Sequence, residues 1–211
     1  MTRLFLLCCL VGCARAEPST VDGNGATPTP DMGMRPIDAR SVDAPTSGAC
    51  GQPFTGVLAS WDFAGEVGSQ LATTVSATAA GVSAGNVSRS AALTAVSGAS
   101  SINASNWPLA LQRDLTKYYT VTLSAPSGCA LQVTAIAVDA HASSTGPLMA
   151  VLATSNDNYG QTMPVSTTAP STPVMSIATG MIEMRIYGYA ASGTAGTLRL
   201  QNTLSITGSV Q

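Results

Sequence analysis

The chain has 211 residues, enough for one domain of ordinary size with accessory segments but too few for two full domains. Charged residues make up 9% of the sequence, against about 25% in a typical soluble protein, and the net charge is −2. No cluster of Lys or Arg is present to bind phosphates, which excludes nucleic acid as a partner. The single histidine and the lack of Cys or His pairs at ligand spacing exclude the usual zinc and iron sites, and we expect no cofactor.

The N-terminal segment 1–13 has the pattern of an export signal. Arg3 supplies a positive charge, and the apolar run 4–11 is shorter than the roughly 20 residues that cross a bilayer. The run ends in Leu10-Val11-Gly12-Cys13, which resembles the lipobox of bacterial lipoproteins, where a large aliphatic residue and two small residues precede a cysteine.

This resemblance implies cleavage before Cys13 and a thioether bond from its sulfur to a diacylglycerol. Buried acyl chains contribute about 0.8 kcal/mol per CH₂, so two or three chains on one residue make a durable membrane anchor. We therefore expect a signal peptide at 1–12 and a protein attached by lipid to a bacterial membrane, the outer membrane in our interpretation. Its domain would lie in the periplasm or at the cell surface. Cleavage near Ala14 or Ala16, which would release a soluble protein, is the alternative.

Residues 14–48 contain no aromatic residue, and prolines recur there among Thr, Ser, Gly and Asp. Such a segment buries too little apolar area to offset the entropy of ordering it. We expect residues 13–49 to form a lipidated N-terminus and a disordered linker. Docking of Met32, Met34 and Ile37 on a partner is the alternative.

From Cys50 onward, short alternating runs are separated by Gly, Pro, Ser and Asn, a pattern typical of strands joined by turns. No stretch has a capped helical stripe. We expect residues 50–211 to form one all-β domain, a single antiparallel β-sandwich that is jelly-roll-like. The predicted strands are 57–63, 118–123, 131–139, 149–154, 174–178, 182–187 and 198–206.

The alternation also assigns side chains to the two faces of each strand. In the first strand, Val57, Ala59, Trp61 and Phe63 are expected on one face. The third strand changes phase between its two halves, which predicts a β-bulge near Thr134. The other residues predicted to be buried are Tyr119, Val121, Leu123, Leu131, Val133, Ile136, Val138, Ile182, Met184, Ile186, Leu198, Leu200, Leu204 and Ile206.

Two cysteines remain after export, Cys50 at the start of the domain and Cys129 in a turn between two predicted strands. In an oxidising compartment we expect them to form a disulfide. Closing a loop of nearly 80 residues would stabilise the fold by about 4 to 5 kcal/mol in the chain-entropy model. Two free buried thiols are the alternative.

An ordered set of short segments resembles the secreted β-sandwich domains of bacterial surface proteins that often carry a C-terminal sorting signal of the PEP-CTERM type. The resemblance implies a jelly-roll-like sandwich whose first and last strands lie side by side. This chain differs from the family because no apolar helix and basic tail precede its last residue, and we expect the N-terminal lipid to replace them. The segments are Leu58-Ala-Ser-Trp-Asp-Phe63, Tyr118-Tyr-Thr-Val-Thr-Leu123, Ile136-Ala-Val-Asp139, Gly146-Pro147, Arg185-Ile-Tyr-Gly-Tyr189, Gly196-Thr-Leu-Arg-Leu-Gln-Asn202 and Thr207-Gly208.

Three aromatic residues are candidates for ligand binding. Trp107, followed by a proline, is placed in a loop, where its ring would either stack on a sugar or cover the edge of the core. Tyr187 and Tyr189 fall opposite to the buried set of their strand and are the best candidates for an exposed aromatic platform. Packing against other parts of the protein is the competing interpretation for both.

No catalytic site is predicted. His141 and Asp139 would resemble part of a hydrolase triad, but no Gly-x-Ser-x-Gly turn exposes a nucleophile, and we expect a solvated histidine in a loop. The carboxylates are interpreted as turn or surface residues. Related sandwiches hold a calcium ion between their first and last strands, but Gln201 stands where an acidic partner of Asp62 is needed, and no metal site is predicted.

The function predicted from sequence is non-enzymatic. The main hypothesis is a membrane-anchored module outside the cytoplasm with a structural or adhesive role. The alternative is a carbohydrate-binding module that uses Trp107 or the pair Tyr187 and Tyr189. The expected partners are the membrane, through the N-terminal lipid, and a polysaccharide or a surface protein.

Overall fold

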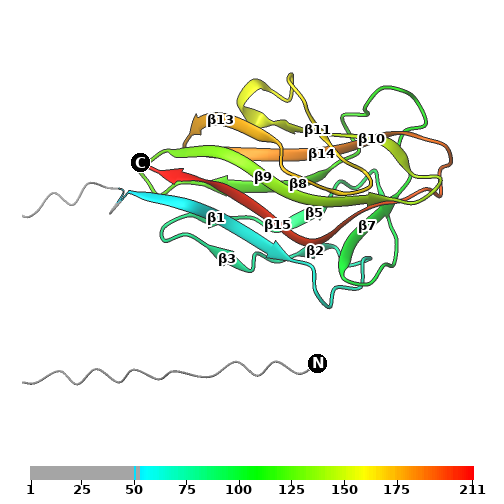
Figure 1. The fold of residues 1–211 in the computed structure, drawn as a ribbon, viewed down its shortest axis with the longest axis horizontal. Coiled ribbons are helices and arrows are strands. Elements are labelled where there is room, and N and C mark those ends of the chain that lie inside the picture. The colour runs from blue at the N-terminus through cyan, green and yellow to red at the C-terminus, as the bar shows by residue number, and fades with distance from the viewer. Residues whose placement is uncertain (1–49, 51–52) are drawn as a thin grey trace, which may run out of the picture. The chain divides into compact units, whose positions relative to one another are not determined.

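A computed structural model describes Cys50 and residues 53–211 (Figure 1). The predicted signal peptide 1–12, the lipidation site Cys13 and the linker 13–49 lie outside the described residues. Within the described residues, no helix is long and apolar enough to cross a membrane.

Strands make up nearly all the regular structure, together with one short 3₁₀ helix, η1. The strands are β1 (Phe54–Asp62), β2 (Ala72–Thr73), β3 (Ala77–Thr78), β4 (Ser83–Ala84), β5 (Val87–Arg89), β6 (Thr94–Ala95), β7 (Ser101–Ser105), β8 (Tyr119–Ser124), β9 (Leu131–Ala142), β10 (Pro147–Thr154), β11 (Met163–Val165), β12 (Pro170–Ser171), β13 (Val174–Thr179), β14 (Met181–Ala191) and β15 (Leu198–Val210), and η1 is Ser155–Asp157.

The strands form two antiparallel sheets, and the predicted all-β sandwich is confirmed. The first sheet has the order β12-β9-β15-β1-β3, with β13 paired to β9 and with β7 and β6 added beside β15. The second has the order β11-β10-β14-β8-β5-β2, with β4 paired to β8. The chain passes repeatedly from one sheet to the other, for example from β8 to β9, from β9 to β10 and from β14 to β15, as in a jelly roll. The first and last strands, β1 and β15, pair directly, as expected (Figure 1).

The core lies between the sheets and follows the predicted alternation. In β8 and β14, alternate apolar residues are buried, and full burial of such a side chain contributes about 1.5–3 kcal/mol. Trp61 is fully buried, and its indole Nε1 donates a hydrogen bond of 3.0 Å to the carbonyl of Gly85. The confirmed core residues are Tyr119, Val121, Leu123, Leu131, Val133, Ile136, Val138, Ile182, Met184, Ile186, Leu198, Leu200, Leu204 and Ile206.

The pairing of the first sheet is irregular at four points, and two of these are bulges that bear on the predicted faces. The predicted one is confirmed: Thr207 pairs with Ala135 and Gly208 with Val133, so Thr134 is the extra residue. A second bulge, in β1 between Val57 and Ala59, was not predicted. It changes the phase of the strand, so Val57 is 50% exposed and the expectation that it shares the buried face is wrong.

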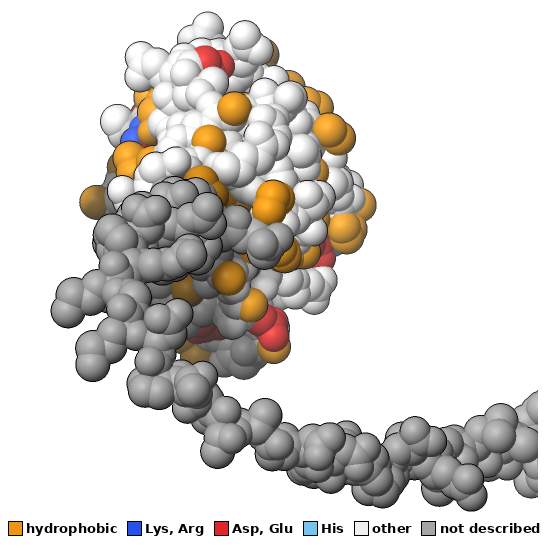
Figure 2. All heavy atoms as spheres, turned by 90° about the vertical axis from the view of Figure 1, so that its left-hand side faces the viewer, with side chains coloured by type: hydrophobic (Ala, Val, Ile, Leu, Met, Phe, Trp, Pro, Cys, Tyr) orange, Lys and Arg blue, Asp and Glu red, His pale blue; other side chains and the backbone are white. Residues whose placement is uncertain are grey.

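The beginning and the end of the domain lie together. Cys50 and Cys129 form the predicted disulfide, with their Cα atoms 5.3 Å apart. Ala130 and Gln211 exchange backbone hydrogen bonds of 2.8 and 2.9 Å beside it. Figure 2 shows this end of the domain, where most of the visible described surface is uncharged and polar and the apolar side chains are spread across it. The chain therefore enters and leaves the domain at one end.

Candidate functional site

Strand β14 presents two different rows of side chains to the two sides of its sheet. Its even-numbered residues from Ile182 to Ile186 face the core, so Glu183, Arg185, Tyr187 and Tyr189 face outward. The neighbouring strand β10 adds side chains to the same outward row, because residues paired across antiparallel strands share a face. The pairs are Ala153 with Arg185, Val151 with Tyr187, and Met149 with Tyr189.

A loop from β7 to β8, residues 106–118, folds over this outward row. Backbone hydrogen bonds of 2.9 and 3.0 Å run from Ala190 and Ala191 to carbonyls at residues 110 and 108. Ala190 has a φ of 58°, in the left-handed region that residues other than glycine rarely adopt. This backbone conformation turns the end of β14 towards the loop. The loop places the Arg113 guanidinium carbon 5.2 Å from the ring centroid of Tyr187. Tyr187 is therefore covered although it points away from the core.

Arg185, the second arginine of this face, is fully engaged by its neighbours. Its guanidinium carbon lies 4.1 Å from the ring centroid of Tyr118 and 4.0 Å from that of Tyr159. Its Nε lies 2.6 Å from Oε1 of Glu183, and the hydroxyl of Thr120 donates a hydrogen bond of 3.0 Å to the same oxygen. The positive charge of Arg185 is thus neutralised within the protein.

The surroundings of this face shift the pKa values of Glu183 and Tyr159, among others. Burial acts to raise the pKa of Glu183, but the hydrogen bonds from Arg185 and Thr120 outweigh it and hold this pKa below its ordinary value. Burial and the negative charge of Glu183 raise the pKa of Tyr159 to about 12. Glu183 is therefore ionised and Tyr159 neutral at physiological pH.

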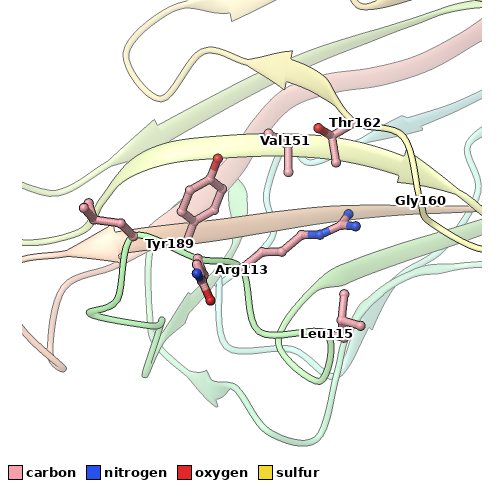
Figure 3. Close-up of a pocket in the computed structure, with 8 residues that line it drawn as sticks. Arg113, Leu115, Val151, Gly160, Thr162 and Tyr189 are labelled. Atoms are coloured by element: carbon pink, nitrogen blue, oxygen red, sulfur yellow. The ribbon is translucent and has the colours of Figure 1, made fainter.

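An open groove of about 480 Å³ lies beside this cluster, a volume within the range of about 300–1,000 Å³ typical of ligand sites. The loop contributes Leu111, Gln112, Arg113 and Leu115 to its lining, β10 contributes Val151, β14 contributes Tyr189, and the segment after η1 contributes Gly160 and Thr162. In Figure 3 the ring of Tyr189 stands at one end, and the side chain of Arg113 extends towards Gly160 at the other. We call this site the Tyr189 groove.

The structure corrects two of the three aromatic candidates. Trp107 is 1% exposed, its Nε1 donates a hydrogen bond of 2.8 Å to the carbonyl of Ala104, and its ring centroid lies 5.5 Å from that of Tyr119. It covers the edge of the core and offers no free ring face. Tyr187 is 0% exposed, which excludes it from an exposed platform. Tyr189 is half-buried and lines the groove, so it alone of the three is accessible to a ligand.

The expected loop position of His141 is also wrong, because β9 continues three residues beyond its predicted end. Within β9, His141 Nε2 lies 2.8 Å from Oδ1 of the buried Asp139. The side-chain amides of Gln201 and Asn202 donate to Oδ2 of the same carboxylate. In the described part of the chain, no serine hydroxyl is hydrogen-bonded to His141, so these residues form a structural polar cluster rather than a triad.

Three of the other carboxylates accept backbone hydrogen bonds in turns, as expected. Asp62 Oδ1 accepts from the N–H of Ala64 at 2.9 Å, and Asp157 Oδ2 accepts from that of Gln161 at 2.6 Å. Asp114 Oδ1 accepts from both the N–H and the hydroxyl of Thr116, and these bonds lower the pKa of Asp114. Among the described residues, no three His, Cys, Asp or Glu side chains gather in a way that would hold a metal ion.

Sequence reasoning missed the non-aromatic part of the groove. Arg113, Gln112 and Thr162 lie in loops, where periodicity carries no information about neighbours. One feature of the sequence pointed to this part of the groove. The chain has 9 Lys and Arg in 211 residues, so an arginine near an aromatic segment is a rare cation that can lie over an aromatic ring.

No protein-family model and no curated protein matches this sequence. Among solved structures, the chain is similar to a mutant family 29 carbohydrate-binding module in complex with mannohexaose, with a TM-score of 0.33 and 13% identity over 74% of this chain and 94% of that one. A second family 29 module has a TM-score of 0.32 and 13% identity, covering 74% and 90%. A further mutant of the first has a TM-score of 0.31 and 11% identity, covering 74% and 93%. Similarity at this level carries no argument about the ligand of this chain.

Proposed function

We propose that the domain is a non-catalytic carbohydrate-binding module whose ligand occupies the Tyr189 groove. The observation that carries this proposal is an accessible tyrosine ring in an open groove beside polar side chains, Gln112, Arg113 and Thr162. One face of a sugar ring presents C–H groups that pack on an aromatic ring, while its hydroxyls need hydrogen-bonding partners at the edge. The groove offers both kinds of contact.

The engagement of the acidic side chains supports a binding role over a catalytic one. A glycosidase needs two carboxyl groups facing each other across the scissile bond. No carboxylate lines the groove within the described structure. Three acidic groups in neighbouring segments, Asp114, Asp157 and Glu183, are held by hydrogen bonds from Thr116, Gln161 and Arg185.

We also propose that the domain is held on a bacterial membrane, the outer membrane, by lipid at Cys13. Strand β14 begins beside the turn that holds Cys129, because Ala125 donates to the carbonyl of Gly180, and ends at the loop that covers Tyr187. Tyr189 therefore lies near the end of β14 that is farther from Cys50 and Cys129. A groove at the end of the domain away from Cys50 supports a domain tethered through its N-terminal side.

A glycan array followed by calorimetric titration tests the binding proposal. We expect the chain to retain one class of oligosaccharide, and Tyr189→Ala to weaken its affinity by about tenfold or more, as loss of a central aromatic contact does. Tyr189→Phe keeps the ring and serves as the matched control, with affinity close to that of the parent. Unchanged binding by Tyr189→Ala would place the ligand elsewhere. A chain that retains no glycan would instead favour the structural or adhesive role.

Mass spectrometry of the membrane fraction tests the anchor. We expect an N-terminal peptide that begins with an acylated Cys13, and we expect Cys13→Ala to leave the membrane. A mature chain that begins downstream of this residue without lipid would refute the proposal.

A further inference from the structure

The Tyr189 groove contains one charged side chain, Arg113, and its charge is not neutralised by a neighbour. The residues that line the groove include no carboxylate, and in the described part of the chain no Asp or Glu oxygen lies within 4 Å of the Arg113 guanidinium. The carboxylate of the adjacent Asp114 accepts two hydrogen bonds from Thr116 and forms no ion pair with Arg113. Arg113 is thus a cation without an internal counter-charge.

The guanidinium is nevertheless held in place. One nitrogen, Nη2, donates a hydrogen bond of 2.5 Å to the backbone carbonyl of Tyr159, and the group lies over the ring of Tyr187. The other terminal nitrogen, Nη1, is shielded from water and has no acceptor in the described structure. An arginine has five N–H donors, and a buried donor without a partner costs about 1–3 kcal/mol. Arg113 therefore makes a single hydrogen bond within the described structure, and a ligand would reach it through the part of the side chain that lines the groove.

The backbone that holds Arg113 is itself in a conformation that side chains disfavour. Asn158 and Tyr159 have φ angles of 54° and 60°, in the left-handed region, which asparagine tolerates but which costs about 1–2 kcal/mol for a residue such as tyrosine. This turn directs the carbonyl of Tyr159 to Arg113 while its ring packs on Arg185. Such conformations concentrate at binding sites, where the surrounding structure maintains them.

Arg185 differs from Arg113 in having a carboxylate partner within the protein. Arg185 lies between two tyrosine rings and is paired with Glu183 at 2.6 Å, so it has no charge left for a ligand. Arg113 has the same kind of aromatic support without the carboxylate. A planar guanidinium with free N–H groups matches a carboxylate in shape and charge.

We propose that the groove selects an acidic polysaccharide, with the anionic group of one sugar at Arg113 and a neighbouring sugar ring on Tyr189. This inference rests on the proposed carbohydrate-binding function and names its substrate class. The anionic group is a carboxylate, as in a uronic acid, because a planar carboxylate matches the planar guanidinium; a sulfate ester is the other source of the same charge.

The test compares ligands that differ only in charge, using the full chain. Oligogalacturonate is titrated against its methyl-esterified form, which has the same sugar rings without the negative charge. We expect the acid to bind at least about tenfold more tightly, the preference to weaken as salt rises, and Arg113→Gln to abolish it. Arg199→Gln, the same charge change at an exposed position on the other sheet, is the matched control and should leave the preference unchanged.

Folding of Arg113→Gln is checked by its melting temperature, and Arg113→Lys, which keeps the charge without the fork, should retain part of the preference. A sulfated oligosaccharide that binds more tightly than oligogalacturonate would identify a sulfate ester as the source of the charge. Equal binding of the acid and its ester, or a preference that survives in Arg113→Gln, would overturn the inference and leave the proposed function standing. Failure to bind any glycan would overturn both.

Discussion

The disulfide between Cys50 and Cys129 should supply a large share of the stability of the domain. It joins residues that are 79 apart in the sequence and fixes the start of β1 beside the turn that precedes β9. In the chain-entropy model, opening a loop of about 80 residues lowers the free energy of unfolding by about 4.5 kcal/mol at 25 °C. This is comparable with the total stability of many domains, which is about 5–15 kcal/mol.

The double variant Cys50→Ala/Cys129→Ala measures this contribution. At about 2–4 °C per kcal/mol for a domain of this size, the melting temperature should fall by about 9–18 °C. Circular dichroism under oxidising conditions gives the value, and the same measurement in reductant is the control, because only the parent should then lose stability. A variant that melts within about 3 °C of the oxidised parent would show that the bond does not constrain the unfolded chain as reasoned.

Three further substitutions test other parts of the structure by urea unfolding. Trp107→Ala should lower the free energy of unfolding by about 3–5 kcal/mol, because it empties a buried site, and a loss below about 1 kcal/mol would contradict its place in the core. Asp139→Ala should cost about 2–4 kcal/mol, since it leaves the donors around the carboxylate without an acceptor, and an unchanged midpoint would contradict that role. Glu183→Gln should cost about 1–2 kcal/mol at pH 7. Because the folded pKa of Glu183 is lowered, its contribution is fully present above the unfolded value of about 4.3 and is lost as the pH falls through the folded value. The difference from the parent should therefore shrink below about pH 4, and a constant difference would contradict the pairing with Arg185.

Side-chain alternation predicted the fold because it reports directly on which face of a strand is buried. The sets around Val121, Met184 and Leu200 were confirmed, as was the bulge at Thr134, where a change of phase is visible in the sequence itself. The bulge in β1 left no such signal, because Val57 and Leu58 are both apolar and either phase fits the pattern.

The short strands between 72 and 105 were not predicted. Strands of two or three residues, such as β2 and β5, contain too few positions to show a period. They form by pairing with longer neighbours: β5 pairs with β8, and β2 with β5. Their positions depend on contacts between segments distant in sequence.

The candidate site could be predicted only in part, because alternation identifies the face of a sheet but not what covers that face. It placed Tyr187 and Tyr189 correctly on the side away from the core. Whether each ring is accessible depends on the loop 106–118, which covers the first ring and leaves the second in the groove. The same limit explains Trp107, a loop residue whose ring turns into the core.

The position of the ligand is the most direct test of the Tyr189 groove. Backbone amide signals of the chain would be followed by NMR during titration with the best oligosaccharide from the array. The account predicts that the largest shifts occur at residues 111–115, at 160–162 and at Tyr189, and that they saturate with one affinity. Shifts confined to another surface, such as that around His141 and Arg199, would contradict it.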